Sequence, residues 1–236
     1  MVKDSSTLNK AYEIKKFLTK EEVFEYSYSL LNNLKYTKEK PIVIVPGGTS
    51  PRDFFKLLLT KNYDWTQIEF LLSDERLVDI NSSKSNFRQI NDLFLNKLDH
   101  DRRPNLFPKM DKLKTIDKKE ILFYMNKRYE NLPTISIAFL GIGDDGHTAS
   151  IFGDDKFDKK KTPFFLTKRL VEKFSRISIS TNYLCSAKKI VFFLIGKKKK
   201  RLLEMIGKNE IDIPVNEIIN NAKGKVLVLT DLDTND

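Results

Sequence analysis

Hydrophobic residues in this chain occur in two alternating patterns, short apolar or β-branched runs and longer segments in which they recur every three or four positions. The short runs predict strands over residues 42–45, 68–72, 135–140, 177–180, 190–195 and 226–229, and several of them are near-continuous, as in strands buried on both faces. The three- and four-residue spacing predicts helices over residues 21–34, 51–59, 86–97, 118–129 and 198–206. Strands that alternate with helices predict an α/β fold, here a doubly wound, mostly parallel sheet flanked by helices in a Rossmann-like domain.

Length and composition limit the class of protein. A chain of 236 residues, 40% of them hydrophobic, is long enough to bury one sizeable core, so we expect a single domain over residues 1–236. The longest apolar run, 190–195, is far shorter than the roughly 20 residues of a membrane-spanning helix. The charged N-terminal segment does not resemble a secretory signal, and the only cysteine, Cys185, excludes an internal disulfide. These features predict a cytoplasmic protein without a membrane partner, and they leave monomer and homodimer equally open.

The formal net charge is +10, from 42 basic and 32 acidic residues. Clustered lysine and arginine can bind nucleic acid by releasing counterions from phosphates. However, the basic runs 159–161 and 197–200 are pure lysine and lack the interleaved aromatic side chains of a single-strand binder. No zinc-finger spacing or helix-turn-helix pattern occurs either. We therefore expect solvated lysine-rich surfaces without a nucleic-acid site, and a basic field that attracts a small dianionic substrate.

In sheets of this kind, ligands bind beyond the carboxyl ends of the strands, and the first such place follows the strand predicted at 42–45. Gly47 and Gly48 permit a tight turn, and Thr49 or Ser50 can cap the helix that begins there. Such a turn directs free backbone N–H groups and the positive end of a helix dipole toward one spot, which favours an anion. An ordinary strand-to-helix turn has the same composition, so this segment alone does not decide between the two interpretations.

The second place is the charged triplet Asp74, Glu75 and Arg76, directly after the second predicted strand. Asp74 could orient sugar hydroxyls or a histidine. Arg76 could hold a phosphate or an oxyanion, because a guanidinium group offers fixed and permanently charged donors. The alternative is a surface ion pair that contributes little to stability. Ser85 and Asn86 follow at a predicted helix start and are further candidates for contacts to an anion or a hydroxyl group.

The third place, residues 138–152, has the most unusual composition. A predicted strand breaks here into a loop rich in glycine, which indicates a special backbone geometry. The loop contains Gly141, Gly143, Asp144, Asp145, Gly146 and His147.

The chain has two histidines, and only one of them lies in such a loop. His100 occurs in a polar turn and is expected at the surface, whereas a neutral imidazole at His147 can accept a proton from water near pH 7. We therefore predict that His147 is a general base. A bound metal is not expected, because the HExxH and CxxC spacings of zinc sites are absent. The lack of a GxSxG motif likewise disfavours a serine nucleophile.

Taken together, these segments resemble the 6-phosphogluconolactonase family, which is related to the glucosamine-6-phosphate isomerases and deaminases. The resemblance extends from about residue 41 to 229 and is carried by PGGTSPRDFF, DW, DER, SN, LGIGDDGHTASIF, RISIS, AKKIVFFLIGKKK and IPVNEII, in this order. The deaminases typically have a DEY-like triplet and a GNGHIAFNEP-like loop, so Arg76 and the DGHTASIF form favour the lactonase branch. The chain differs from the lactonase pattern at Asp79 and Ile80, where a proline is usual.

The resemblance implies hydrolysis of 6-phosphogluconolactone to 6-phosphogluconate in the oxidative pentose phosphate pathway, without a cofactor. His147 would activate the attacking water, and Asp74 or Asp145 would steady the imidazole or the sugar. The groups expected to share the phosphate and the developing negative charge are the turn at 47–50, Arg76, Arg176 and Lys199.

Two alternatives remain at this point. One is an isomerase or deaminase of an amino-sugar phosphate, and the other is a non-catalytic sugar-phosphate sensor on the same fold. The catalytic interpretation requires that the segments around Gly47, Asp74 and His147, which are far apart in the chain, fold into one shared pocket.

Overall fold

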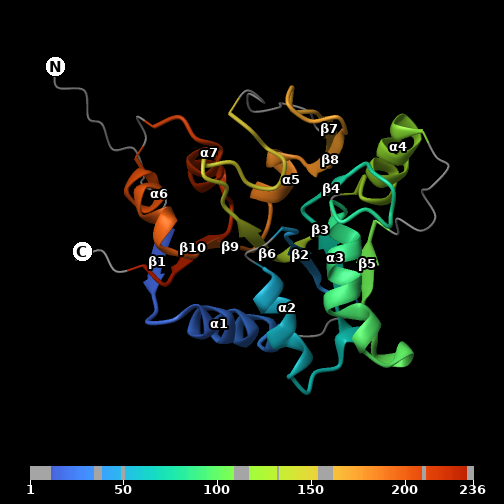
Figure 1. Cartoon of the computed structure of the whole chain (residues 1–236), viewed down its shortest axis with the longest axis horizontal. Helices are drawn as coiled ribbons and strands as arrows, with labels where there is room; N and C mark the ends of the chain where they lie inside the picture. Colours follow the sequence, from blue (N-terminus) through green and yellow to red (C-terminus); the bar gives the residue numbers. More distant parts are fainter. Residues whose placement is uncertain are drawn as a thin grey trace.

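A seven-stranded sheet runs through the chain in the computed structural model, which describes residues 12–34, 39–48, 51–108, 117–131, 133–153, 162–208 and 211–232 (Figure 1). The strand order is β1-β10-β9-β6-β2-β3-β5, and every neighbouring pair is parallel. The strands are β1 (Tyr12–Lys16), β2 (Ile42–Val45), β3 (Glu69–Leu72), β5 (Asn105–Phe107), β6 (Ile135–Gly141), β9 (Lys189–Leu194) and β10 (Lys225–Thr230).

Helices cover both faces of this sheet (Figure 1). One face packs against α1 (Lys20–Asn32), α2 (Arg52–Leu59) and α3 (Asn86–Leu93), and the other against α4 (Lys118–Arg128), α5 (Thr181–Cys185), α6 (Lys200–Met205) and α7 (Pro214–Asn221). Alternate residues of β2 show the division, because Val43 and Val45 join the first core while Ile42 and Ile44 join the second. The connections contain the short 3-10 helices η1 (Trp65–Gln67), η2 (Leu95–Lys97), η3 (His100–Arg102) and η5 (Lys197–Lys199). The predicted doubly wound α/β fold is therefore confirmed.

Aromatic rings fill the core beneath α1 and α2. Phe139 of β6 and Phe193 of β9 stack with their ring centroids 5.7 Å apart and their planes 9° apart, and Phe54 of α2 packs on both. All three side chains are buried, and each contributes about 1.5–3 kcal/mol through the removal of apolar surface from water. This core holds β6 and β9 in place, and with them the segments that follow these two strands at the carboxyl edge of the sheet.

A second, three-stranded sheet corrects one prediction. Residues 177–180 were expected in the large parallel sheet, but β8 (Arg176–Ile179) lies between β4 (Asp74–Arg76) and β7 (Phe164–Thr167) and pairs antiparallel with both. Every residue of β8 is buried, although isoleucine alternates with arginine and serine in its sequence. The sequence pattern could not reveal the pairing, because β4 was not recognised as a strand.

Other differences concern the edges and ends of elements. The edge strands β1 and β5 and the helix α7 were not predicted: β1 is half exposed, and β5 has only three residues. The helix predicted at 86–97 ends at Leu93 and is followed by η2, while the helix predicted at 198–206 begins as η5. None of these differences displaces the loops at the carboxyl edge of the large sheet.

Candidate active site

The segments that follow β2, β3, β6 and β9 meet in one cleft at the carboxyl edge of the large sheet. Its volume is about 310 Å³, and it brings together Gly47, Asp74 and His147, as the sequence predicted. Ligands of parallel α/β sheets bind at this edge. The other lining residues are Pro46, Gly48, Pro51, Ser73, Arg76, Asn86, Gly141, Ile142, Gly143, Asp144, Ala149, Arg176 and Lys199.

The glycine turn after β2 is packed tightly against helix α3. A Cβ atom at Gly47 would lie 2.0 Å from Cγ of Asn86, so only glycine fits there. Gly48 has φ +92°, a backbone conformation that other residues rarely adopt. Thr49 and Ser50 lie outside the described residues, so their predicted role stays a prediction. The turn therefore presents its backbone to the cleft at Gly47 and Gly48.

Asp74 is buried at the base of the cleft in a network of hydrogen bonds. Its carboxylate accepts from Oγ of Ser150 at 2.5 Å, from Oγ of Ser73 at 3.2 Å and from Nδ2 of Asn86 at 3.2 Å. Nη1 of Arg176 lies 3.5 Å from the same carboxylate. The amide of Asn86 also donates to the main-chain oxygen of Asp74 at 2.9 Å. Asp74 thus connects β4, β8, helix α3 and the loop after β6.

Glu75 and Ser85 stabilise the start of helix α3 and do not line the cleft. The buried carboxylate of Glu75 accepts from the backbone N–H groups of Arg76, Asn86 and Phe87 at 2.6–2.8 Å, and from the hydroxyl of Ser85 at 3.1 Å. Burial raises the pKa of Glu75 to about 7, although the backbone hydrogen bonds act to lower it. Ser85 is the N-cap of α3 and accepts from the N–H of Arg88. Its hydroxyl therefore has a structural role where the sequence suggested a substrate contact.

Arg76 lies at the rim between two hollows. Its Nη1 atom donates to the main-chain oxygen of Lys84 at 2.8 Å, and its side chain lines the main cleft. It also lines a neighbouring hollow of about 510 Å³, together with Arg52 and Arg88. Of these three arginines, Arg76 alone lines both hollows, whereas Arg52 and Arg88 line only the second one.

The loop after β6 folds back so that the histidine ring rests on the backbone. The N–H of Gly143 donates to the main-chain oxygen of His147 at 2.8 Å, and the hydroxyl of Thr148 donates to the oxygen of Gly141 at 2.9 Å. A Cβ atom at Gly143 would lie 2.1 Å from the imidazole ring. Gly146 has φ +78° and faces the side chain of Ile213 at a distance that leaves no room for a methyl group. These glycines are needed to place His147 at the wall of the cleft.

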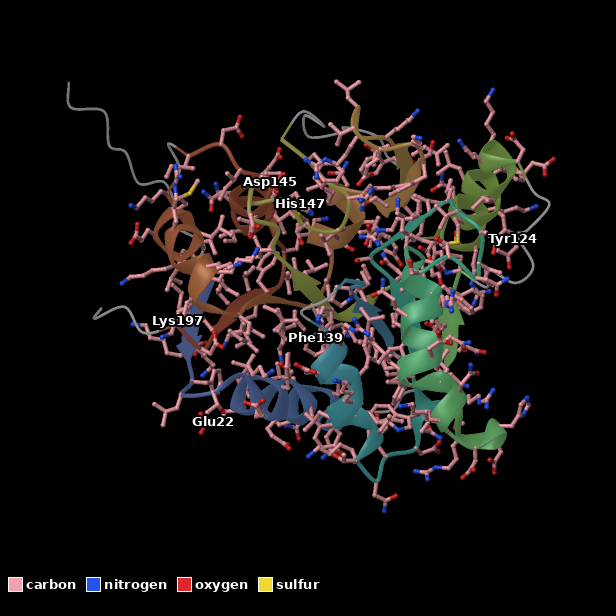
Figure 2. The ribbon with its side chains drawn as sticks, in the orientation of Figure 1. Glu22, Tyr124, Phe139, Asp145, His147 and Lys197 are labelled. Carbon is pink, nitrogen blue, oxygen red and sulfur yellow. The ribbon has the colours of Figure 1, made fainter. Side chains whose placement is uncertain are left out.

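His147 is hydrogen-bonded to Asp145, and Figure 2 shows the two labelled side chains side by side. Nδ1 of the imidazole contacts Oδ1 of Asp145. Because a carboxylate only accepts, this contact assigns the ring proton to Nδ1 and the lone pair to Nε2. Partial burial would raise the pKa of Asp145, but the hydrogen bonds from Nδ1 and from the backbone N–H of His147 hold it below its usual value. Asp145 does not line the cleft itself, so it acts on a ligand only through His147.

Lys199 reaches the cleft from η5, at the end of β9. Its Nζ atom donates to the main-chain oxygen of Ile142 at 2.8 Å and pairs with the carboxylate of Asp144. This hydrogen bond lowers the pKa of Asp144. Only 16% of the lysine side chain is exposed, whereas Asp144 is 88% exposed. The lysine is therefore held toward the cleft by a partner that an incoming anion can displace.

Arg176 is buried beside Asp74 and forms an ion pair with Glu172, a residue that the sequence pattern did not indicate. Glu172 accepts from its Nε and Nη2 atoms at 2.8 and 2.6 Å, a bidentate pair, and its pKa is lowered by that contact. Nη1 also contacts Oγ of Ser150 at 3.2 Å. Neither Glu172 nor Ser150 carried a signal of its own: Glu172 lies in an irregular loop, and Ser150 is an ordinary serine within the glycine-rich segment.

The part of the chain that the structure describes has neither a metal-binding cluster nor a membrane-spanning helix. There, no group of three or more histidine, cysteine, aspartate or glutamate side chains is arranged to hold a metal ion. No described helix is both long and apolar enough to cross a bilayer.

Comparisons with known proteins concern the family and the fold of this chain. The family model for glucosamine-6-phosphate isomerases/6-phosphogluconolactonase matches residues 19–228. A 6-phosphogluconolactonase from Thermotoga maritima is 28% identical over 190 residues, covering 78% of this chain and 83% of that protein, and one from Helicobacter pylori is 26% identical over 181 residues, covering 75% and 78%. The crystal structure of a 6-phosphogluconolactonase from Shewanella baltica has the same fold, with a TM-score of 0.81, 22% identity and coverage of 94% and 98%.

Proposed function

This chain belongs to the family of glucosamine-6-phosphate isomerases and 6-phosphogluconolactonases, and from that premise we propose that it hydrolyses 6-phosphogluconolactone to 6-phosphogluconate. The names of its curated relatives support this branch of the family. The observation that carries the proposal is the orientation of His147, which lines the cleft while Asp145 binds its Nδ1 atom. We place the reaction in the cytoplasm, in the oxidative pentose phosphate pathway, and it needs no cofactor.

The reaction starts with His147 as a general base. Its Nε2 atom takes a proton from water, and the water oxygen forms a bond to the carbonyl carbon of the lactone. Asp145 stabilises the imidazolium that results and keeps the ring oriented. The tetrahedral intermediate then collapses, the bond between the carbonyl carbon and the ring oxygen breaks, and the imidazolium returns its proton to that oxygen. The new carboxylic acid ionises and releases one proton to solvent.

Water is the nucleophile because the nearby hydroxyl is engaged elsewhere. Ser150 lies three residues after His147, but its Oγ atom donates to Asp74 and accepts from Arg176. A covalent mechanism would need a hydroxyl or thiol within hydrogen-bond reach of the imidazole. The contacts of Ser150 therefore favour direct attack by water.

Anion binding is shared by groups on three sides of the cleft. Lys199, Arg76 and the backbone at Gly47 and Gly48 line it together, and we assign them to the phosphate of the substrate. Arg176 already neutralises Glu172 and faces Asp74, so we assign it to holding the cleft wall and to the developing negative charge.

Asp74 and Asn86 position other groups in this proposal. The acceptor atoms of Asp74 are engaged by Ser73, Ser150 and Asn86. A carboxylate whose oxygen atoms are engaged in such a network holds its neighbours in place, which suits it poorly for proton transfer. We therefore assign proton transfer to His147 alone.

A coupled assay tests the proposed function. Glucose 6-phosphate is oxidised enzymatically to generate the lactone in place, and acid release is followed with and without the protein, with spontaneous hydrolysis subtracted. His147→Ala should lower kcat by about 10²- to 10⁴-fold, the usual contribution of a general base. His100→Ala is the matched control and should leave kcat unchanged, because that residue lies in η3 and does not line the cleft.

The outcomes separate the branches of the family. No acceleration of acid release by the wild-type protein would refute the lactonase assignment. Release of ammonia from glucosamine 6-phosphate would instead identify a deaminase, and binding of phosphorylated sugars without turnover would identify a sensor. Normal turnover by the His147→Ala variant would leave the lactonase activity standing but would remove His147 from the mechanism.

A further inference from the structure

The hairpin loop between β7 and β8 lies against the rear of the histidine site. Arg169 projects from this loop and lines a hollow of about 500 Å³ that also includes Asp145, Phe152 and Lys168. This hollow is distinct from the catalytic cleft, and Asp145 lies between the two: it binds His147 on one side and faces the loop on the other.

Four side chains form a closed ring of contacts here. Oδ1 of Asp145 binds Nδ1 of His147, while Oδ2 of Asp145 lies 3.7 Å from Nη2 of Arg169. The guanidinium group of Arg169 lies over the ring of Phe152, 4.7 Å from its centroid. The ring of Phe152 in turn packs against the imidazole, with centroids 4.8 Å apart.

From this ring of contacts we infer that Arg169 is a positioning residue, which holds the Asp145–His147 pair in its reactive orientation without touching the substrate. The inference rests on the proposed function. Asp145 is half exposed, with 51% of its side chain accessible. Its hydrogen bonds with His147, from Nδ1 and from the backbone N–H, both reach Oδ1, so they leave Oδ2 for Arg169 to hold. Arg169 engages the other carboxylate oxygen and presses Phe152 against the imidazole, and both contacts restrain the same pair.

The effect of removing Arg169 is modest, because its contacts are partly exposed. Exposed ion pairs and cation–π contacts are each weak interactions. Together these correspond to a loss of about 3- to 30-fold in kcat. KM should stay within about twofold of the wild-type value, because Arg169 does not line the catalytic cleft.

Three variants test the inference by kinetics. Arg169→Ala should lower kcat as stated. Arg169→Lys should recover part of the loss, because it keeps a positive charge beside Asp145 but lacks the planar group over Phe152. Lys168→Ala is the matched control: the residue is adjacent, lines the same hollow and carries the same charge, yet the described contacts of Asp145 do not include it. This variant should behave like the wild-type protein.

Nuclear magnetic resonance gives a readout that does not depend on activity. The chain has two histidines, so a spectrum of the imidazole nitrogens contains two sets of signals, and the His100→Gln variant identifies them. In Arg169→Ala, the proton on Nδ1 of His147 should exchange with water faster, while the signals of His100 stay in place.

Several results would overturn the inference. These are a kcat in Arg169→Ala equal to that of the wild-type protein, an equal loss in Lys168→Ala, a change confined to KM, or unchanged signals of His147. Absence of lactonase activity in the wild-type protein would refute the proposed function separately, and the signals of His147 would still report whether Arg169 orders the pair.

Discussion

Replacement of Gly143 by alanine should disable the site without unfolding the chain. A Cβ atom at this position would lie 2.1 Å from Cε1 and Nδ1 of His147, whereas ordinary contact begins at 3.4 Å. The imidazole must therefore move by roughly 1 Å, which takes Nδ1 out of hydrogen-bond range of Asp145. The conformation of Gly143 is accessible to alanine, since its φ does not lie in the left-handed region.

The expected loss follows from that displacement. A hydrogen bond to a charged group contributes about 1.5–3 kcal/mol, and each 1.36 kcal/mol changes a rate tenfold. A misplacement of about 1 Å in a catalytic group typically costs about 10²-fold. We therefore expect kcat of Gly143→Ala to fall by about 10- to 150-fold.

The assay is the coupled measurement of acid release, combined with thermal unfolding to show that the variant is folded. Gly141→Ala serves as the control, because a Cβ atom there meets no described atom within 4 Å. Since Gly141 lines the cleft, any effect of its methyl group should appear in KM. A kcat for Gly143→Ala within threefold of the wild-type value would refute the reasoning, because the ring would then tolerate displacement or would not be the base.

Two further predictions concern charge. Burial raises the pKa of Glu75 to about 7 in the folded chain, against 4.5 as the reference. Between these two pH values the folded state binds more protons than the unfolded state, so the free energy of unfolding falls as pH rises, by on the order of 3 kcal/mol. Urea unfolding at several pH values should show that Glu75→Gln loses this dependence of the unfolding free energy on pH, and an unchanged dependence would contradict the prediction. Asp144→Asn should lower KM for the phosphorylated lactone by about two- to fivefold at unchanged kcat, because Lys199 loses its exposed ion-pair partner, which competes with the substrate. Steady-state kinetics at low ionic strength measures this change. A raised KM would show instead that Asp144 helps to position Lys199.

Much of the large sheet could be predicted because its central strands are buried on both faces. Residues 42–45 form an unbroken apolar run, and the run at 135–140 is interrupted only by Ser136; these runs match β2 and most of β6. The strand β8 shows the limit of this reasoning. Its residues are as deeply buried as those of β6, and only its hydrogen bonds to β4 and β7 reveal that it belongs to another sheet.

The candidate site could be predicted where a residue type is chemically unusual for its position. His147 in a glycine-rich loop and the charged triplet at 74–76 after an apolar run stand out in this way. Glu172 and Arg169 do not, because they lie in an irregular loop of a lysine-rich chain, and their roles arise from contacts with residues distant in the sequence. Ser85 misled the prediction for a related reason, since a serine at a helix start serves as a cap as readily as it binds a ligand.

Asn86 packs closely against Gly47 and so couples the position of the glycine turn to that of β4, the strand that carries Asp74. Because the same amide also donates to Asp74, a residue with a larger side chain at Gly47 would disturb both halves of the cleft floor at once. A variant of this chain that is to accept a bulkier ligand would therefore have to gain space at other residues that line the cleft.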